Sequence, residues 1–196
     1  VTRSEEGATT GKGELNQTTI LFTDIEGFTS ISESLPPEDL IAALNQYFSL
    51  VAKPIEANGG VISQFQGDAV LATFNAPKPD PNHASNAVRA ALEIQRALAG
   101  QTFGAGAQFN TRIGINSGLV VGGLVGSGDR VGYTVHGDNV NLTARLEQLN
   151  KDYGTRIIIS ESTYNQINPN EYEFRGLGDV LVRGKKKSIG IYTIDV

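Results

Sequence analysis

An apolar segment that ends on an acidic residue constrains this chain more than any other feature of its sequence. Residues 18 to 23 are rich in β-branched and aromatic side chains, which predicts a buried β-strand. Asp24 follows where this strand should stop, and Gly27 allows the backbone to turn with its N–H groups directed inward. A carboxylate beside free amides can bind a cation on one side and phosphate oxygens on the other, although a plain strand end with an Asx-type turn would show the same residues.

The composition predicts a single folded domain of ordinary size. The chain has 196 residues, of which 39% are hydrophobic and 19% charged, enough for one full-sized core. It contains no cysteine, which excludes disulfides, thiolate metal sites and thiol redox chemistry and is typical of a cytoplasmic protein. The formal net charge of −5 argues against an extended nucleic-acid surface, but a nucleotide can still bind where a metal ion supplies positive charge.

The start of the chain and its hydropathy give three further expectations. Residues 1–13 are polar, contain glycine and show no periodicity, so we expect a disordered linker or tail ahead of one folded domain at 14–196. The chain begins at Val1 and has no methionine, which indicates an excised domain of a longer protein with an N-terminal regulatory domain. No apolar run approaches the roughly 20 residues that a membrane helix needs, so we expect no membrane segment.

Helices and strand pairs alternate along the rest of the chain. We predict helices over a short stretch to about residue 33, from Pro36 to Asn58, from Asn82 to about residue 98, from Gly137 to about residue 150, and over 161–168. Further strands are predicted at 61–66, 69–74, 111–116, 119–125, 130–135, 157–160, around Phe174, at 180–182 and at 189–194. His83, which follows a helix N-cap, is expected at the surface. Helices interleaved with hairpins favour an α+β fold, a ferredoxin-like α/β sandwich in which helices cover a mixed or antiparallel sheet.

A second acidic residue stands at a predicted chain reversal far from the first. Asp68 follows Gly67 at the turn of the 61–74 hairpin. If this hairpin neighbours the strand before Asp24, both carboxylates project from the same end of the sheet. With a backbone carbonyl such as that of Ile25, they would form an oxygen-only site suited to Mg²⁺ or Mn²⁺. A pair of such ions can activate an attacking oxygen and stabilise a leaving phosphate.

Four motifs follow one another along the chain. They are Phe22–Thr29 (FTDIEGFT), Gln66–Asp68 (QGD), Arg112–Gly118 (RIGINSG) and Gly137–Arg145 (GDNVNLTAR). In this order they resemble the class III nucleotidyl cyclase catalytic domain, over about residues 16–194. The resemblance implies that Asp24 and Asp68 hold two metal ions, one lowering the pKa of the ribose 3′-hydroxyl and the other binding the triphosphate. It also implies that the hydroxyl attacks the α-phosphorus and pyrophosphate leaves, which gives a 3′,5′-cyclic nucleotide.

The resemblance also assigns roles to residues of the later motifs. Asn141 and Arg145 lie four residues apart in a predicted helix and so share one face. In the family this pair orients the ribose and stabilises the charge that grows on the α-phosphate. Arg112 and Lys185 match positions that hold the terminal phosphates, although Lys185 stands in a run of basic residues that also suits a solvated surface. The remaining substrate contacts are expected from the turn at Gly27, Phe28 and Thr29.

The residues expected around the base leave the choice between ATP and GTP open. Adenylate cyclases of this class usually carry Lys at the position of Gln64 and Asp or Thr at that of Thr134, whereas guanylate cyclases usually carry Glu and a small residue such as Cys. Lysine donates to adenine N1, whereas glutamate accepts from guanine N1–H and N2–H. The amide of Gln64 can do either because it has both a donor and an acceptor. Since Thr134 matches the adenylate type, we expect an adenylate cyclase, with a guanylate cyclase as the alternative.

The family places each active site between two subunits. One subunit supplies the metal aspartates, and the other supplies the residues that contact the base, the ribose and the transition state. Because this chain holds both sets, we expect a homodimer with two shared sites and two-fold symmetry. The alternative from another class is a catalytically silent module that only dimerises and binds nucleotide. Such a module would be expected to lack a metal aspartate or the Asn–Arg pair, and this chain has all four residues.

Overall fold

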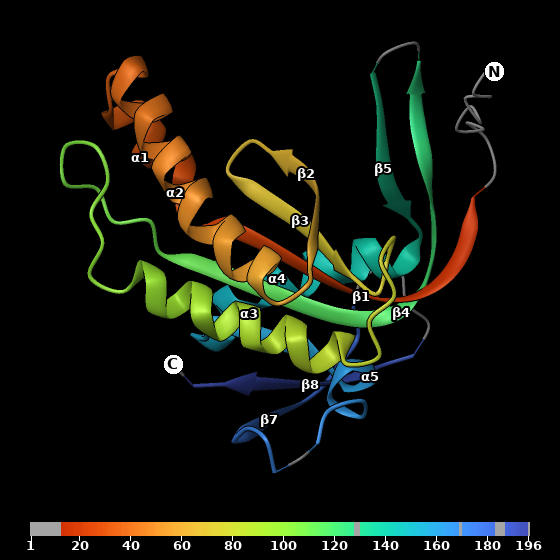
Figure 1. Ribbon diagram of the computed structural model, residues 1–196. Helices are drawn as coiled ribbons and strands as arrows, with labels where there is room; N and C mark the ends of the chain where they lie inside the picture. The colour runs from red at the N-terminus through yellow and green to blue at the C-terminus, as the bar shows by residue number, and fades with distance from the viewer. Residues whose placement is uncertain (1–12, 128–129, 169, 183–186, 196) are drawn as a thin grey trace, which may run out of the picture.

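The computed structural model describes residues 13–127, 130–168, 170–182 and 187–195 (Figure 1). The elements are β1 (Glu14–Ile25), α1 (Phe28–Ser34), α2 (Pro37–Ala57), β2 (Val61–Gln66), β3 (Ala69–Phe74), α3 (His83–Leu98), β4 (Thr111–Ser127), β5 (Arg130–His136), α4 (Asp138–Tyr153), β6 (Ile157–Ser160), α5 (Glu161–Tyr164), β7 (Phe174–Val180) and β8 (Ile189–Ile194). Most of the predicted elements are confirmed. The predicted linker falls almost entirely at 1–12, outside the described residues, and stays a prediction.

One mixed sheet organises the domain. Its strands run in the order β2-β3-β1-β4-β6-β8-β7, and β5 pairs with the far part of β4. The β4–β6 pair is parallel and the other pairs are antiparallel. The predicted fold class, an α+β sandwich with a mixed sheet covered by helices, is therefore confirmed. Among the helices that the structure describes, none is long and apolar enough to cross a membrane.

Helices cover both faces of the central strand β1. Ile20 and Leu21 are adjacent, so their side chains point to opposite faces, yet neither is exposed to solvent. Leu21 packs in the main core with side chains of α2 and α3, such as Tyr47 and Val88. Ile20 packs in a smaller cluster that includes Val140 of α4. Burial on both faces explains why the middle of β1, Ile20–Phe22, is apolar at successive positions instead of alternating with polar residues.

The prediction of two strands at 111–116 and 119–125 was wrong, because β4 is one strand of 17 residues. Ser117 and Gly118, which suggested a break, stay in register with Thr19 and Thr18 of β1. A neighbouring strand that supplies hydrogen bonds along this length overrides the local turn preference of serine and glycine. The predicted helix at 161–168 is also shorter than expected and is limited to α5.

The prediction that His83 lies at the surface was wrong. Its side chain is only 8% exposed, and Nδ1 lies 2.6 Å from Oγ1 of Thr19 in β1. Thr19 Oγ1 also lies 2.6 Å from Oγ of Ser117 in β4. Burial lowers the pKa of His83, which favours the neutral imidazole in this position. The first turn of α3 is thus fixed against the sheet by a buried polar contact that no local pattern indicates.

Candidate active site

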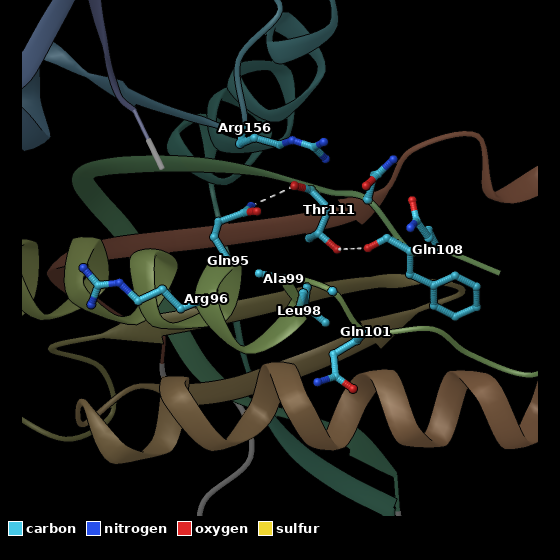
Figure 2. Close-up of a pocket in the computed structure, with 11 residues that line it drawn as sticks. Gln95, Arg96, Leu98, Ala99, Gln101, Gln108, Thr111 and Arg156 are labelled. Atoms are coloured by element: carbon cyan, nitrogen blue, oxygen red, sulfur yellow. Dashed lines mark hydrogen bonds between the residues drawn. The ribbon is translucent and has the colours of Figure 1, made fainter. Parts of the chain in front are cut away.

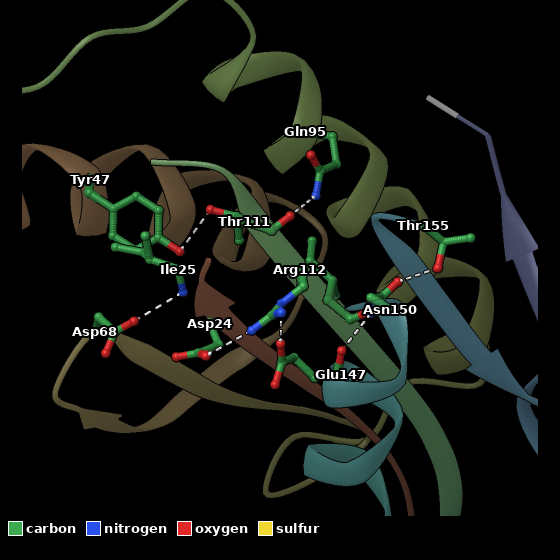
Figure 3. A network of polar contacts seen from close by, with 11 residues as sticks. Asp24, Ile25, Tyr47, Asp68, Gln95, Thr111, Arg112, Glu147, Asn150 and Thr155 are labelled. Atoms are coloured by element: carbon green, nitrogen blue, oxygen red, sulfur yellow. Dashed lines mark hydrogen bonds and ion pairs between the residues drawn. The ribbon is translucent and has the colours of Figure 1, made fainter. Parts of the chain in front are cut away.

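The structure places the two aspartates of the predicted metal site side by side (Figure 3). The hairpin β2–β3 lies against β1, with Val70 opposite Thr23, so the β2–β3 turn meets the end of β1. Asp68 Oδ2 accepts a hydrogen bond of 3.0 Å from the backbone N–H of Ile25. The Asp68 carboxyl lies close enough to that of Asp24 to raise its pKa. Residues 44 positions apart in the chain therefore form one acidic cluster at this end of the sheet.

This cluster has more negative charge than its surroundings neutralise. The pKa of Asp24 is raised from 3.8 to about 7, first by burial and then by the hydrogen bond and the negative charge of Asp68. The charge of Glu147 raises it further, and Arg112 opposes the rise. Two carboxyl groups that resist ionising together would be stabilised by a cation between them, which fits a divalent metal ion.

The chain supplies only part of a coordination shell. Within the described part of the chain, no three His, Cys, Asp or Glu side chains converge as a metal site. The other ligands would have to come from a backbone carbonyl such as that of Ile25, from water or from a bound phosphate. Mg²⁺ suits such an arrangement because it keeps several of its waters and takes few carboxylates.

Glu147 of α4 belongs to this site, and the sequence reasoning missed it. Its side chain is 2% exposed, and Oε1 lies 2.9 Å from Nε of Arg112, although the two groups are not aligned as a hydrogen bond. The other end of the guanidinium, Nη2, lies 3.6 Å from Oδ2 of Asp24. Arg112 is therefore held between two carboxylates, one buried and one at the predicted metal site (Figure 3). The signal that could have identified Glu147 is its position on the helix. It lies one turn after the buried Thr143, so it is an acidic residue on the face of α4 that packs against the sheet.

Two glycines of the RIGINSG motif allow α4 to lie this close to β4. A Cβ at Gly114 would lie 2.4 Å from the Thr143 carbonyl oxygen and 2.5 Å from the Glu147 backbone nitrogen. A Cβ at Gly118 would lie 2.4 Å from Nδ2 of Asn139. At Gly114 the clash would be with backbone atoms, so only glycine permits the approach there, whereas at Gly118 it would be with a side-chain amide that would have to move. The same side chain of Asn139 donates to the Leu119 carbonyl at 2.8 Å, which holds the start of α4 on the strand.

A second layer of contacts supports the start of β4, next to Arg112. The hydroxyl of Thr111 lies 3.2 Å from the hydroxyl of the buried Tyr47, and Gln95 Nε2 donates to the Thr111 carbonyl at 2.8 Å (Figure 3). Burial, the largest cause, raises the pKa of Tyr47 to about 12. Helices α2 and α3 thus both fix the residue that precedes Arg112.

A cavity of about 300 Å³ opens beside this layer. The end of α3, the segment 99–101, residues 108–111 and Arg156 line it (Figure 2). None of the predicted site residues is among the lining residues, so this cavity is distinct from the acidic cluster.

Asn141 and Arg145 lie away from the acidic cluster, on the outer side of α4. Thr143 and Leu146 of the same helix are buried, whereas Asn141 is exposed and Arg145 is half-buried. Nη1 of Arg145 is buried and has no hydrogen-bond partner among the described residues. The structure of a single chain therefore brings together Asp24, Asp68 and Arg112 but does not pair Asn141 or Arg145 with them.

The remaining predicted residues lie on three separate elements. Gln64 is exposed on β2, and Thr134 lies on β5 opposite Gly123; the two strands approach each other. The segment Gly27–Thr29 opens α1: Gly27 has a left-handed backbone with φ 68°, its carbonyl accepts from the N–H of Ser30, and the N–H groups of Phe28 and Thr29 precede this first helical hydrogen bond. Lys185 lies outside the described residues, so its role stays a prediction.

Two proteins named as adenylate cyclases are similar in sequence to most of this chain. It is 40% identical over 182 residues to adenylate cyclase 1 of Rhizobium meliloti (strain 1021) and 36% identical over 199 residues to an adenylate cyclase of Anabaena cylindrica. These alignments cover 91% and 96% of this chain but only 27% and 39% of those proteins. The chain thus spans less than half the length of either relative.

Solved structures resemble the fold closely. The guanylate cyclase domain of RhGC from Catenaria anguillulae, in complex with GTP, matches with a TM-score of 0.83 and 30% identity, covering 93% of this chain and 98% of that one. The adenylyl cyclase CyaB from P. aeruginosa matches with a TM-score of 0.80 and 30% identity, covering 94% and 96%. The profile of the adenylate and guanylate cyclase catalytic domain matches residues 11–195. The chain therefore belongs to the adenylate and guanylate cyclase catalytic domain family.

Proposed function

We propose that this chain is an adenylate cyclase domain that converts ATP into 3′,5′-cyclic AMP and pyrophosphate. The observation that carries the proposal is the acidic cluster of Asp24 and Asp68 beside Arg112, in a chain that also presents Asn141 and Arg145. The relatives from Rhizobium meliloti and Anabaena cylindrica are named adenylate cyclases, which supports ATP. GTP is the second candidate, because the amide of Gln64 can read either base and one structural relative was solved with GTP.

The acidic cluster would hold two divalent cations, Mg²⁺ or Mn²⁺, through Asp24, Asp68 and the Ile25 carbonyl. When bound, such ions supply the positive charge that favours loss of the ribose 3′-hydroxyl proton and neutralises the triphosphate. The Ile25 N–H orients the Asp68 carboxylate through a 3.0 Å hydrogen bond. A carboxylate oriented in this way needs no rearrangement to accept a cation.

Arg112 would bind the terminal phosphates, together with Lys185 and the amides of Gly27–Thr29. Glu147 contacts the guanidinium at Nε, and the Nη2 contact with Asp24 is the longer of the two, at 3.6 Å. A triphosphate can replace Asp24 at Nη2 while Glu147 still holds the other side. Glu147 is thus a positioning residue in this scheme, since it acts through Arg112 and not on the substrate.

Asn141 would orient the ribose, and Arg145 would stabilise the negative charge that grows on the α-phosphate. An arginine suits this role because it stays protonated and offers several donors in one plane. The unpaired Nη1 of Arg145 supports the assignment, because a buried donor without a partner is costly unless a ligand accepts from it.

The proposed active unit is a homodimer in which each site takes its acidic cluster from one subunit and its Asn141–Arg145 pair from the other. Strands β1, β4 and β5 meet at one part of the sheet (Figure 1). This part carries exposed apolar side chains. Leu15, Leu119, Val121 and Val125 are 46–65% exposed, and the register places Leu15 opposite Val121. Leu119, Val121 and Val125 lie two and four positions apart in sequence, so their side chains share one face of β4. An apolar stripe of this kind suits burial against a second copy of the chain.

Mixing two inactive variants tests the shared site. Asp24→Ala removes one half of the site and Arg145→Ala the other, so a mixed dimer keeps one intact site and has one doubly defective site. If subunits exchange freely, half of the dimers are mixed, and we expect about a quarter of the wild-type activity to return. Mixed dimers proven by differential tagging but without activity would contradict the shared site.

The reaction itself is tested with the purified domain. We expect turnover of ATP in Mg²⁺ or Mn²⁺, with 3′,5′-cyclic AMP and pyrophosphate formed in equal amounts, and a lower kcat/KM for GTP. A higher kcat/KM for GTP would replace the proposal by a guanylate cyclase. Absence of cyclic product from either nucleotide, with both nucleotides still bound, would favour a silent module.

A further inference from the structure

A second amide lies beside Gln64 on β2, and the resemblance gives it no role. Gln66 Nε2 donates a hydrogen bond of 3.0 Å to Oε1 of Gln64. The two residues are two positions apart in a strand, so their side chains share one face of the sheet. Both side chains are exposed in the single chain and accessible to a ligand.

A β-bulge decides which face these two amides occupy. Ile62 pairs with Ala72, but Gln64 pairs with Leu71, so Ser63 is an extra residue in β2. Without the bulge, Ser63 would stand opposite Leu71, and the side chain of Gln64 would point to the other face. Bulges beside binding sites commonly re-aim a side chain in this way.

The face chosen by the bulge is the one that β5 approaches. Leu71 packs in a cluster with Val135 of β5 and with Tyr133. Since Gln64 pairs with Leu71, and Gln66 with Ala69 two residues earlier, both glutamines lie on the Leu71 side of the hairpin. Thr134, the other residue expected at the base, belongs to the same strand β5.

The hydrogen bond from Gln66 sets the orientation that the amide of Gln64 has in this structure. A glutamine amide has one carbonyl oxygen, which accepts, and one NH₂ group, which donates. Gln66 already supplies a proton to the carbonyl oxygen, so the NH₂ group of Gln64 is the part left to face a ligand. Adenine N1 is an acceptor, whereas guanine presents donors at N1–H and N2–H₂.

We propose that Gln66 is a specificity-determining residue that orients the amide of Gln64 as a hydrogen-bond donor and so favours adenine over guanine. This inference rests on the proposed function, in which Gln64 faces the base. The carbonyl oxygen of Gln64 has a second lone pair, so the effect is a graded preference for ATP and not an absolute exclusion of GTP.

Two substitutions at position 66 distinguish a side chain that donates to Gln64 from one that accepts from it. In Gln66→Glu the carboxylate can only accept, so it binds the NH₂ group of Gln64 and releases the carbonyl oxygen toward the base. We expect the ratio of kcat/KM for ATP to that for GTP to fall about tenfold, the usual size of one mismatched hydrogen bond. In Gln66→Lys the ammonium can only donate, so it still holds the carbonyl oxygen, and the ratio should stay within about threefold of wild type.

A Gln64→Leu background distinguishes an action through Gln64 from direct contact of residue 66 with the base. In this background Gln66→Glu should leave the ATP-to-GTP ratio unchanged. Equal ratios in wild type, Gln66→Glu and Gln66→Lys would overturn the inference, and so would a shift that persists without Gln64.

The same variants are also titrated with ATP and GTP in the presence of Mn²⁺, and the ratio of the two Kd values is compared. This binding ratio should shift with Gln66→Glu in the same direction as the kinetic ratio. If the wild type forms no cyclic nucleotide, the proposed function fails, and the Kd ratio still decides the role of Gln66. If cyclic AMP forms but neither ratio responds to Gln66→Glu, only the role of Gln66 fails.

Discussion

The acidic cluster at the end of β1 lacks positive charge, whereas the outer side of α4 lacks a hydrogen-bond acceptor. In the cluster, burial and then the neighbouring carboxylates of Asp68 and Glu147 raise the pKa of Asp24 to about 7, against the single opposing charge of Arg112. The outer side of α4 has the opposite imbalance, because Nη1 of Arg145 is buried without a partner among the described residues. One region needs positive charge and the other needs an acceptor.

This comparison explains how a metal–nucleotide complex would join the two regions. The cations would neutralise the carboxylates, and the phosphate oxygens would accept from the arginine. Neither region is satisfied by the other within one chain; in the proposed function the ligand and a second subunit would complete the site. The predictions below test the two regions, beginning with the largest expected effect.

Asp24→Ala should abolish the function of the acidic cluster. Loss of one metal carboxylate removes several kcal/mol of stabilisation, so we expect kcat for ATP to fall by about 10³ or more. Initial rates of cyclic AMP formation measure the effect. Glu33→Ala, which removes an exposed carboxylate of α1, serves as the matched control and should keep the wild-type rate. Wild-type turnover by Asp24→Ala would rule out a metal site here.

Arg145→Ala tests the other region. Loss of a donor to the charge on the α-phosphate should lower kcat by about 10²–10³, with little change in KM. The substitution should leave the thermal unfolding midpoint nearly unchanged, since Nη1 has no internal partner to lose. Lys151→Ala removes an exposed cation from the same helix and should have no effect on kcat. A rise in KM alone would instead assign Arg145 to substrate binding.

Gly114→Ala tests the contact that joins α4 to the sheet. The added Cβ would meet backbone atoms of Thr143 and Glu147 at 2.4–2.5 Å, so α4 must shift, and we expect the free energy of unfolding to fall by about 1–3 kcal/mol. Gly132→Ala on β5 is the matched control, because no atom of the described residues lies within 4 Å of its Cβ position. Urea unfolding of both variants measures the difference. Equal stability of the two would show that α4 does not depend on this close approach.

Glu147→Gln should reduce activity without removing any group that touches the substrate. The neutral amide holds Arg112 less firmly, and we expect kcat/KM for ATP to fall about tenfold, the equivalent of roughly 1.4 kcal/mol. In an Arg112→Ala background the same substitution should change kcat/KM little, since its effect acts through the guanidinium. Additive losses in the double variant would place Glu147 in direct contact with the reaction instead.

The pH dependence of stability tests the charge imbalance of the acidic cluster. The pKa of Asp24 in the folded chain, about 7, lies above its unfolded value of 3.8. The folded chain therefore keeps this proton over a range where the unfolded chain has lost it, and the stabilisation is lost as the pH rises from about 4 to 7.

Thermal unfolding in EDTA measures this effect against the matched variant Asp24→Asn, which does not titrate at this position. The unfolding midpoint of Asp24→Asn should rise above that of wild type as the pH increases from 5 to 8. Excess Mg²⁺ at pH 8 should stabilise the wild type more than the variant. A difference between the two midpoints that does not depend on pH would contradict the raised pKa.

Residue patterns within short segments predicted much of the fold and the proximity of the two aspartates. The apolar run before Asp24 and the glycine-marked hairpin before Asp68 are local signals, because strand periodicity and turn chemistry depend on neighbouring residues. The α+β class follows from the order of such elements along the chain. The oxygen-only metal site was inferred from the two carboxylates, whereas the transition-state roles came from the resemblance, and both remain predictions to be tested.

The sequence by itself determined where strands end on acidic residues and which motifs follow one another, because these features depend on neighbouring residues. Only the tertiary structure decided that β4 runs unbroken, that His83 is buried, that Glu147 holds Arg112, and that a bulge at Ser63 turns Gln64 toward β5. Each of these depends on how strands pair and how closely a helix approaches them. Such pairings join residues far apart in the chain, so no local pattern contains them.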